Sequence, residues 1–527
     1  MDLEIITAWD DWEQWATEDW STLPLIIKSP QSTGGPPLSW KTAWEISSPY
    51  SVVLESGKGG RYTYLGLRPI SVLKGKGGNA EHFNPYLEAT NAMYEATMLQ
   101  GQPLDLLQHW MSGFTSPRLL NPEIPPFLGG CIGFLGYDVV RSLEHLPSLT
   151  LDDAGFPDYL FIRLEEVWIY DHEEDMLYCA VHMPIPAESS NENLKSIYLS
   201  AIEQTKEMLK HWQLISSAPG LQEDSEKATE AHAAASGEWP GMTSAFSREQ
   251  FQQAVLDVQE YIRQGDVFQV NLSLRQEAQL KSSPEDVYEW LRKLNPSPYM
   301  GLLRSPGFAL SSASPELLVK LHGDNISARP IAGTRRRGMT LAEDAAMEAE
   351  LRGSDKEIAE HIMLVDLERN DIGRVAAYGS VSVPELMTVE RYSHVMHLVS
   401  QVEGRIAPGK DAYDVMAALF PGGTITGAPK VRTMEIIEEL EPVRRGPYTG
   451  SMGWIDYNGN MELNIIIRTL AVKDGIGYIQ TGAGIVIDSD PYREYRECHN
   501  KAKAVVKAVL CSESQQESRI PTAPKGE

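Results

Sequence analysis

The sequence predicts a mixed α/β fold of the α+β type, in which short strands and amphipathic helices follow one another. Residues 166–170 and 176–181 are two strand-like runs joined by a polar turn, which is the pattern of a β-hairpin. Residues 267–274 alternate apolar and polar side chains with a period of two, as a half-buried strand does. The segment before them repeats apolar residues at helical spacing instead. Both kinds of element are therefore expected throughout the chain.

Composition and charge narrow the class of protein. The chain has 527 residues, 42% of them hydrophobic and 23% charged, which is the composition of a globular protein with a sizeable core. Its net charge of −27 argues against bulk binding to nucleic acid or to anionic membranes. The four cysteines lie far apart, without a C-x-x-C pair, and no basic leader or long apolar run is present. We therefore expect a cytoplasmic protein with no membrane segment.

The chain is expected to divide into four stretches. Residues 1–215 mix short strands and helices, and residues 216–245 are rich in Ser, Ala, Gly, Glu and Pro, as in a flexible linker or insertion. Residues 246–511 carry the more informative motifs. Residues 512–527 are polar and are predicted to form a disordered tail.

The helix and strand near residue 260 have the clearest signals. Ser247 and Gln250 form a capping box, and Gly265 ends the helix. The apolar face of this helix is predicted to consist of Phe251, Val255, Val258 and Ile262. The apolar face of the strand should consist of Phe268, Val270, Leu272 and Leu274. Its other face carries Gln269, Asn271 and Ser273. That polar face is either half exposed or lines a polar pocket.

Two later helices carry carboxylates on one face. A capping box of Ser354 and Glu357 should begin the first, which we expect to end in a charged turn at 368–374. Its predicted core stripe is Ile358, Ile362 and Val365. Glu360 lies on a different face. The last helix should start at Pro491 and run to about residue 510, with one stripe formed by Glu494, Glu497 and Lys501. Such carboxylates are usually solvated, but a pair of them can bind Mg²⁺.

A basic stretch at 329–338 contains four arginines and two glycines in an otherwise acidic chain. Guanidinium groups and turn N–H groups bind carboxylates well, so the stretch suits an anionic small molecule, with a solvated basic loop as the alternative. Residues 129–133 have the G-x-C-x-G form of a nucleophilic elbow around Cys131. We interpret Cys131 instead as a small buried cysteine between close-packed glycines.

The C-terminal half resembles the chorismate-utilising enzymes, namely the large subunits (component I) of anthranilate synthase and aminodeoxychorismate synthase, with isochorismate and salicylate synthases as more distant relatives. The segments that carry this resemblance occur in family order over some 250 residues: 269–273, 314–316, 330–334, 366–375, 392–397, 422–430, 467–469, 482–484 and 494–501. The N-terminal half resembles the family more weakly, at 53–56, 129–137 and the hairpin after 166.

The resemblance implies a fold of two packed antiparallel sheets flanked by helices, with the substrate in a cleft of residues 246–511. It implies Mg²⁺ bound by Glu360 and Glu497, with Glu494 as an alternative. It implies Glu316 as the general acid that protonates the departing 4-hydroxyl of chorismate, and His397 as a residue linked to aromatisation. The positions implied for substrate binding are Gly333, Thr334, Tyr448, Arg468, Gly482, Ala483, Gly484 and Lys501.

Gln269 implies which nucleophile is used. Relatives that add water carry a lysine base at this position, whereas the amine-adding enzymes carry glutamine, and a neutral amide cannot activate water. Ammonia is the implied nucleophile. It normally comes from a glutamine amidotransferase subunit, for which this chain has no convincing domain. We therefore expect a hetero-oligomer with such a partner, and activity of the chain alone with free ammonia.

The product remains open between two branches. Ala332 occupies the position where many aminodeoxychorismate synthases have a lysine that attacks the ring. Alanine at this position is the anthranilate synthase pattern. Asn271 and the segments 423–426 and 465–468 resemble aminodeoxychorismate synthases. The chain also resembles anthranilate synthases in their tryptophan-binding element, at Ser56, Pro298, Tyr299 and Met300. We expect component I of an aminodeoxychorismate synthase, with anthranilate synthase component I as the alternative and a non-catalytic aromatic-acid-binding regulator as a third possibility.

Overall fold

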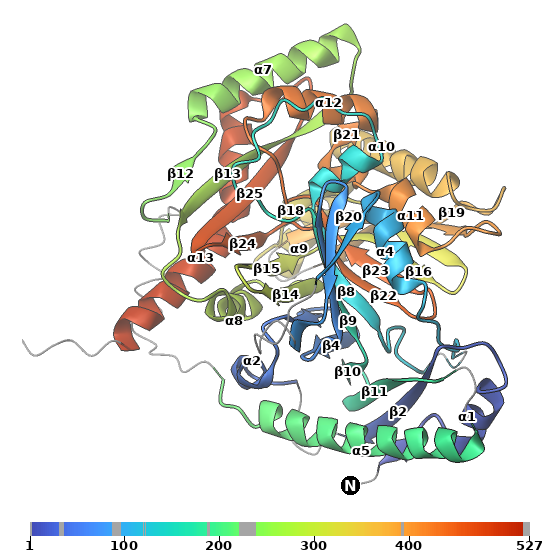
Figure 1. Ribbon diagram of the computed structural model, residues 1–527. Helices are drawn as coiled ribbons and strands as arrows, with labels where there is room; N and C mark the ends of the chain where they lie inside the picture. The colour runs from blue at the N-terminus through green and yellow to red at the C-terminus, as the bar shows by residue number, and fades with distance from the viewer. Residues whose placement is uncertain are drawn as a thin grey trace, which may run out of the picture.

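Two antiparallel sheets packed face to face form the centre of the computed structural model (Figure 1). The structure describes residues 3–30, 36–86, 96–119, 121, 123–186, 190–220, 239–391 and 395–519. Every strand ladder among these residues is antiparallel, which confirms the predicted architecture. Residues 392–394 of the 392–397 motif and residues 520–527 of the predicted tail lie outside the described residues.

The first sheet contains the strand that carries Gln269. In order across the sheet its strands are β1 (Glu4–Ile5), β2 (Thr22–Pro30), β11 (Met176–Pro184), β10 (Glu166–Asp171), β4 (Tyr62–Gly66), β3 (Ser51–Glu55), β14 (Tyr299–Ser305), β15 (Phe308–Ser314), β24 (Thr469–Lys473), β25 (Ile476–Ile485), β13 (Gln269–Gln279) and β12 (Thr243–Ser244), with β21 (Gly427–Ala428) beside β13. The predicted hairpin is β10–β11.

The second sheet contains the basic stretch and His397. Its order is β18 (Ile331–Arg336), β20 (Val395–Arg405), β17 (Asn325–Ala328), β16 (Leu317–His322), β23 (Met461–Asn464), β22 (Ser451–Asp456), β8 (Gly130–Leu135), β9 (Tyr159–Leu164), β5 (Ser71–Lys76), β6 (Asn79–Phe83) and β7 (Thr97–Gln100), with β19 (Ser382–Arg391) beside β20. Both sheets combine strands from 1–215 with strands from 246–511, because β3 pairs with β14 and β8 with β22.

Helices cover the outer faces of the sheets, and apolar side chains fill the layer between the sheets. The helices are α1 (Trp9–Trp15), α2 (Lys41–Ile46), α4 (Pro103–Met111), α5 (Asn191–Ser216), α7 (Arg248–Gln264), α8 (Pro284–Leu294), α9 (Leu341–Arg352), α10 (Asp355–Gly373), α11 (Ala412–Leu419), α12 (Lys430–Leu440) and α13 (Pro491–Arg519), with 3-10 turns η1 (Tyr137–Ser142) and η2 (Gly423–Ile425). The described helices include none that is long and apolar enough to cross a membrane.

Three local predictions were wrong. Phe268 is 69% exposed, because β13 begins one residue later, at Gln269, and leaves Phe268 outside the ladder. Ile362 is 46% exposed, because α10 turns His361, Leu364 and Val365 towards the protein interior instead. The same helix continues through 368–373, where we expected a turn. The capping box of Ser247 and the end of α7 at Gly265, in the left-handed region, are confirmed.

The linker and tail predictions need correction at their described ends. Residues 221–238 lie outside the described residues, but Trp239 is buried and Thr243 and Ser244 pair with β13. At the C-terminus, α13 continues past 511 to Arg519 instead of giving way to a disordered tail. The extra turns are held by Glu513, which is 8% exposed and accepts a hydrogen bond from the N–H of Lys281 at 3.0 Å.

Candidate functional site

A strand ladder with two glycines forms the floor of the site. In the pairing of β13 with β25, Asn271 lies opposite Gly484, and Ser273 lies opposite Gly482. A Cβ atom on Gly484 would come within 2.3 Å of the Gln269 side chain, and one on Gly482 within 2.3 Å of the Asn271 Oδ1 atom. Only glycine therefore lets the two amide side chains lie across the strand. Ala483 points to the other face and is fully buried.

The two amides each keep an oxygen atom available. The Gln269 Nε2 atom donates to Glu360 at 3.2 Å, and the Asn271 Nδ2 atom donates to the carbonyl of Thr424 at 3.2 Å. The Gln269 Oε1 and Asn271 Oδ1 atoms are buried and have no hydrogen-bond partner among the described residues. A buried acceptor without a donor is costly, so these oxygens suit a ligand that brings N–H groups.

Glu316 is a buried acid between the two sheets, in the short connection from β15 to β16. Burial raises the pKa of its carboxyl group to about 7, although Thr424, Arg468 and Lys501 lower it again. A carboxyl group with this pKa is still protonated in a large fraction of molecules at neutral pH. Glu316 can therefore donate a proton, which an exposed glutamate cannot do under the same conditions.

Arg468 supplies a positive charge next to this acid. Its backbone has φ of 54°, in the left-handed region, and its guanidinium group lies near Glu316, Tyr448 and Glu497. Burial lowers its pKa. Across the described ranges, no side chain forms a hydrogen bond or ion pair with this guanidinium group. A partly buried, unpaired arginine is a ready partner for a substrate carboxylate.

His397 and Thr334 form a second wall. The Thr334 hydroxyl and the His397 Nδ1 atom are 3.0 Å apart, and the carbonyl of Gly333 lies 3.3 Å from the same nitrogen. Burial lowers the pKa of His397, and Arg468 lowers it further. Gly333 has φ of 71° at a bulge in β18, where a side chain would be strained. The bulge therefore places Thr334 opposite His397.

The four arginines of the basic stretch form ion pairs within the protein. Each pairs with a carboxylate of the protein itself, and the pairs are Arg329 with Glu390, Arg335 with Glu357, Arg336 with Glu343, and Arg337 with Asp344. These ion pairs neutralise the four guanidinium groups, and Arg329 also lines a cavity, so the binding of an anion by this stretch stays a prediction. The helix that follows, α9, supplies two of the carboxylates, and sequence spacing alone does not reveal such pairs.

Carboxylates gather at one edge of the site. Burial raises the pKa of Glu360 and of Glu494, and Lys356 lowers both, so the two carboxyl groups lie around the same ammonium group. Glu497 is more open and forms an ion pair with Lys501 at 2.8 Å. The Lys501 Nζ atom also donates to the carbonyl of Gly482 at 2.8 Å. Among the described residues no three potential ligands are grouped closely enough to hold a metal by themselves.

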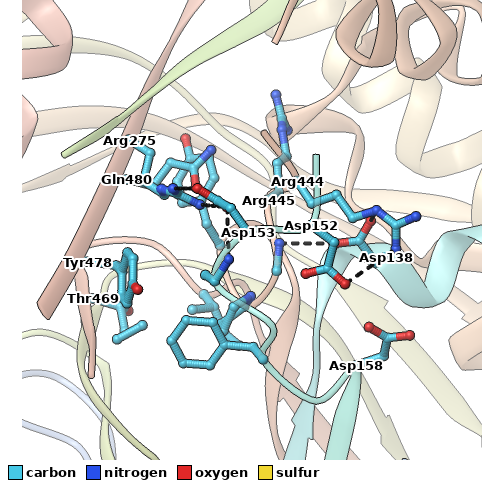
Figure 2. Close-up of a pocket in the computed structure, with 17 residues that line it drawn as sticks. Asp138, Asp152, Asp153, Asp158, Arg275, Arg444, Arg445, Thr469, Tyr478 and Gln480 are labelled. Carbon is cyan, nitrogen blue, oxygen red and sulfur yellow. Dashed lines mark hydrogen bonds and ion pairs between the residues drawn. The ribbon is translucent and has the colours of Figure 1, made fainter. Parts of the chain in front are cut away.

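A buried ion pair that the sequence did not reveal fixes this floor. Arg445 pairs with Glu441 at 2.7 Å, donates to the carbonyl of Asn271 at 2.7 Å and lies over the ring of Tyr448. The Tyr448 hydroxyl would lie 2.8 Å from a Cβ atom on Gly482. Figure 2 shows Arg445 in the wall of a small pocket of about 40 Å³, which Tyr448 also lines. The ion pairs of this pocket are Arg275 with Asp153, and Arg444 with Asp138 and Asp152.

The four residues of the predicted tryptophan-like element lie elsewhere. They line a separate cavity of about 640 Å³, and they are Ser56, Pro298, Tyr299 and Met300. This volume is within the range of small-molecule sites. Cys131 is fully buried in β8, and burial raises the pKa of its thiol, so it cannot act as the nucleophile of an elbow motif.

A protonatable buried acid beside an unpaired arginine, set between two antiparallel sheets, is an arrangement that suits an enzyme acting on a small carboxylate substrate. The chain belongs to the family of chorismate binding enzymes, whose model matches residues 50–507. This membership confirms that the protein is a chorismate-converting enzyme, as the resemblance implied.

Three relatives illustrate the likeness. Aminodeoxychorismate synthase component 1 of Bacillus subtilis (strain 168) is 45% identical over 90% of this chain and 94% of its own length. Anthranilate synthase component 1 of Acetivibrio thermocellus is 40% identical over 93% of this chain and 96% of its own length. The crystal structure of anthranilate synthase component I from Streptococcus pneumoniae TIGR4 has a TM-score of 0.67 at 32% identity, covering 85% of this chain and 92% of that chain.

Proposed function

We propose that this chain catalyses the Mg²⁺-dependent amination of chorismate to 4-amino-4-deoxychorismate, as component I of an aminodeoxychorismate synthase in the cytoplasm. The observation that carries amination is the pair of unpaired amide oxygens on Gln269 and Asn271, beside a buried acid. Ammonia offers N–H donors to such oxygens. The 45% identity to the Bacillus subtilis aminodeoxychorismate synthase component supports the product.

The site residues have separate proposed roles in proton donation and substrate binding. Glu316 donates its proton to the 4-hydroxyl, which leaves as water, and Arg468 holds a carboxylate of chorismate. The carbonyl of Gly482 and the hydroxyl of Tyr448 lie at the floor, where they contact the ring and its substituents. Gln269 has no basic group to activate water, so ammonia is the nucleophile that remains.

The carboxylate edge fits a magnesium ion. Partial burial makes Glu360 and Glu494 resist ionisation although Lys356 favours it, and a divalent cation would stabilise both as anions. Mg²⁺ typically uses one or two carboxylates together with waters and substrate oxygens, so a closed cluster of protein ligands is not required. Glu360 and Glu497 are the proposed ligands, with Glu494 beside them, and the ion would neutralise a chorismate carboxylate.

The ammonia is proposed to come from a glutamine amidotransferase subunit. This follows from Cys131, which is buried in β8 and cannot serve as the nucleophile of an amidotransferase site within this chain. The names of the two relatives describe them as component 1, which supports a second component for this chain. The expected assembly is therefore a hetero-oligomer.

Anthranilate synthase component I is the second candidate. Ala332, which is 7% exposed in β18, supports it, because alanine cannot attack the ring covalently. The cavity lined by Ser56 and Met300 also supports it, because this cavity has room for an aromatic amino acid such as tryptophan. Under this alternative, ammonia adds to C2 and pyruvate is released.

One product assay separates the candidates. The purified chain is incubated with chorismate, Mg²⁺ and ammonium, and the products are followed by anthranilate fluorescence and by a coupled pyruvate assay. We expect chorismate to be consumed without fluorescence or pyruvate until an aminodeoxychorismate lyase is added. Anthranilate and pyruvate without the lyase would assign the chain to the tryptophan branch, and no consumption of chorismate would contradict the enzymatic proposal.

Replacing Gln269 with lysine should divert part of the reaction towards a hydroxylated product. A neutral lysine amine can accept a proton from water, whereas the amide cannot. We expect amination to fall by about fivefold, since one side-chain contact to the nucleophile is worth on the order of 1 kcal/mol. Chromatography of the products measures this. Gln269→Met is the control, because it removes the amide without adding a base, and amination alone in Gln269→Lys would refute the role.

A further inference from the structure

A small pocket lies beside the floor of the chorismate site, on the same face of the first sheet. Its volume is about 40 Å³, which leaves room for a molecule of a few non-hydrogen atoms. In the β13–β25 ladder Arg275 lies opposite Gln480, two residues along from the pair of Ser273 and Gly482. Because side chains two residues apart share a face, the pocket continues the surface that carries Asn271. Figure 2 shows Arg275 and Gln480 side by side in its wall.

Gln480 brings an unpaired hydrogen-bond acceptor to this pocket. The residue is 6% exposed, and its Oε1 atom has no hydrogen-bond partner among the described residues. The orientation of the amide is fixed, because Nε2 donates to the Ser273 hydroxyl at 2.8 Å and that hydroxyl donates in turn to Glu441 at 2.8 Å. The oxygen therefore calls for a donor that the described residues do not supply.

Arg275 brings an unpaired donor to the same end of the pocket. It is also 6% exposed, and its Nε atom has no partner in the described part of the chain. Its other two nitrogens are occupied, since one donates to Asp153 at 2.8 Å and the other pairs with Asp153 and, at 2.9 Å, with Glu277. Its charge is thereby neutralised, so a neutral acceptor is enough for Nε. Directly opposed Cβ atoms lie about 5 Å apart, so one small ligand can reach both Arg275 and Gln480.

Apolar and aromatic groups line the space next to these two polar atoms. Ala471 lies opposite Tyr478 in the β24–β25 ladder, and the rings of Phe156 and Tyr478 meet edge to face at 5.5 Å. Pro447 and Ile466 also line the pocket. A carbon substituent on a ligand would pack against these walls, whereas a water molecule has no apolar surface to bury there.

The other charged groups of the lining have partners within the protein. Arg444 lies 3.9 Å from both Asp138 and Asp152. The further pairs are Asp138 with Arg141 at 3.0 Å, Asp152 with Lys76 at 2.5 Å, Arg445 with Glu441 at 2.7 Å, and Asp158 with the N–H of Gly77 at 2.7 Å. A charged ligand would have to compete with these partners, whereas a neutral ligand would leave them in place.

We propose that this pocket is a second ligand site, which takes a small neutral primary amide. The carbonyl oxygen of the amide accepts from the Arg275 Nε atom, and its N–H donates to the Gln480 Oε1 atom. Its carbon substituent packs against Tyr478 and Phe156. A primary amide suits this end of the pocket because it carries an acceptor and donors on neighbouring atoms without a net charge. The site is distinct from the chorismate site and does not depend on the proposed function.

Three probes of the same shape test the class of ligand. Acetamide, acetone and acetate have equal numbers of non-hydrogen atoms, but only acetamide has N–H donors and only acetate is charged. Saturation-transfer NMR titrations of the full-length wild type give their dissociation constants. We expect acetamide to bind at least about fivefold more tightly than acetone, the usual share of one hydrogen bond, and acetate to bind no better than acetone. Equal binding of acetamide and acetone, tighter binding of acetate, or no saturable binding of acetamide would overturn the inference.

Gln480→Met tests where the amide binds. Methionine keeps the length of the side chain but removes Oε1, so the affinity for acetamide should fall about fivefold while that for acetone stays the same. Gln259→Met is the matched control, because Gln259 is also 6% exposed but donates to the carbonyls of Ile487 and Ser489, outside the pocket. Equal losses in both variants, or none in Gln480→Met, would contradict the site. If Gln480→Met does not fold, the three probes on the wild type still decide.

Titrating chorismate against bound acetamide separates the two sites. If the sites are distinct, the apparent dissociation constant of acetamide should stay the same or reach a plateau as chorismate is raised. A dissociation constant that rises in proportion to chorismate without a plateau would place acetamide in the chorismate site and overturn the inference. A wild type that binds acetamide as expected but does not aminate chorismate would refute the proposed function alone.

Discussion

Replacing Glu316 with glutamine should reduce the turnover of chorismate by about 10²- to 10⁴-fold, the usual contribution of a general acid. The hydroxyl of chorismate is a poor leaving group until it receives a proton, and Glu316 is the buried acid beside Arg468 that can supply one. Glutamine has nearly the same shape and keeps the packing between the sheets. Binding of chorismate should therefore change only a few-fold, because Arg468 remains in place.

The pH dependence sharpens this test. The acid form of Glu316 is the active one, and its pKa is about 7, so wild-type activity at constant free ammonia should decline above pH 7. Glu316→Gln should lose most of its activity and also the decline above pH 7. Glu316→Asp should retain a weaker decline. Steady-state kinetics separate turnover from binding. If the turnover of Glu316→Gln were within threefold of the wild type, another group would have to donate the proton.

The parts of the site that the sequence predicted depend on local spacing. The alternation in β13 places Gln269 and Asn271 on one face, and the cap at Ser247 fixes where the preceding helix begins. The resemblance implied Gly482 and Gly484 as substrate-binding positions, and the structure shows that both leave room for those two amides. Each of these signals arises within a few residues, where strand and helix periods constrain the geometry.

The parts that the sequence did not reveal depend on contacts between distant segments. The arginines at 329–337 were expected to face a ligand, but carboxylates of α9, α10 and β19 neutralise them. The resemblance implied Arg468 as a substrate-binding residue, but the sequence does not reveal that its guanidinium group has no hydrogen bond or ion pair among the described residues. On α10 the apolar Ile362 is exposed, whereas the charged Glu368 and Asp371 are buried. Asp371 forms an ion pair with Lys430 there. Periodicity cannot distinguish a buried acid from a solvated one.

Replacing Glu360 with alanine should raise the Mg²⁺ concentration that gives half-maximal activity by at least about tenfold, since Mg²⁺ binds through only one or two carboxylates and each is a large share of its affinity. Glu360 is the more buried of the two proposed ligands and also accepts the hydrogen bond from Gln269. Its loss should therefore disturb both the ion and the amide. Glu497→Ala should also raise the Mg²⁺ concentration that gives half-maximal activity, but by less. Glu497 is half exposed and already forms an ion pair with Lys501.

Titration calorimetry of Mg²⁺ in the presence of chorismate measures this change directly, and the kinetic Mg²⁺ dependence provides an independent comparison. Glu357→Ala is the matched control on the same helix, since Glu357 pairs with Arg335 and not with the proposed ion. Weaker Mg²⁺ binding in Glu360→Ala but not in Glu357→Ala would place the ion at the carboxylate edge. Unchanged Mg²⁺ dependence in both Glu360→Ala and Glu497→Ala would move the ion to other ligands, because two lost carboxylates cannot both be silent at a site that uses them.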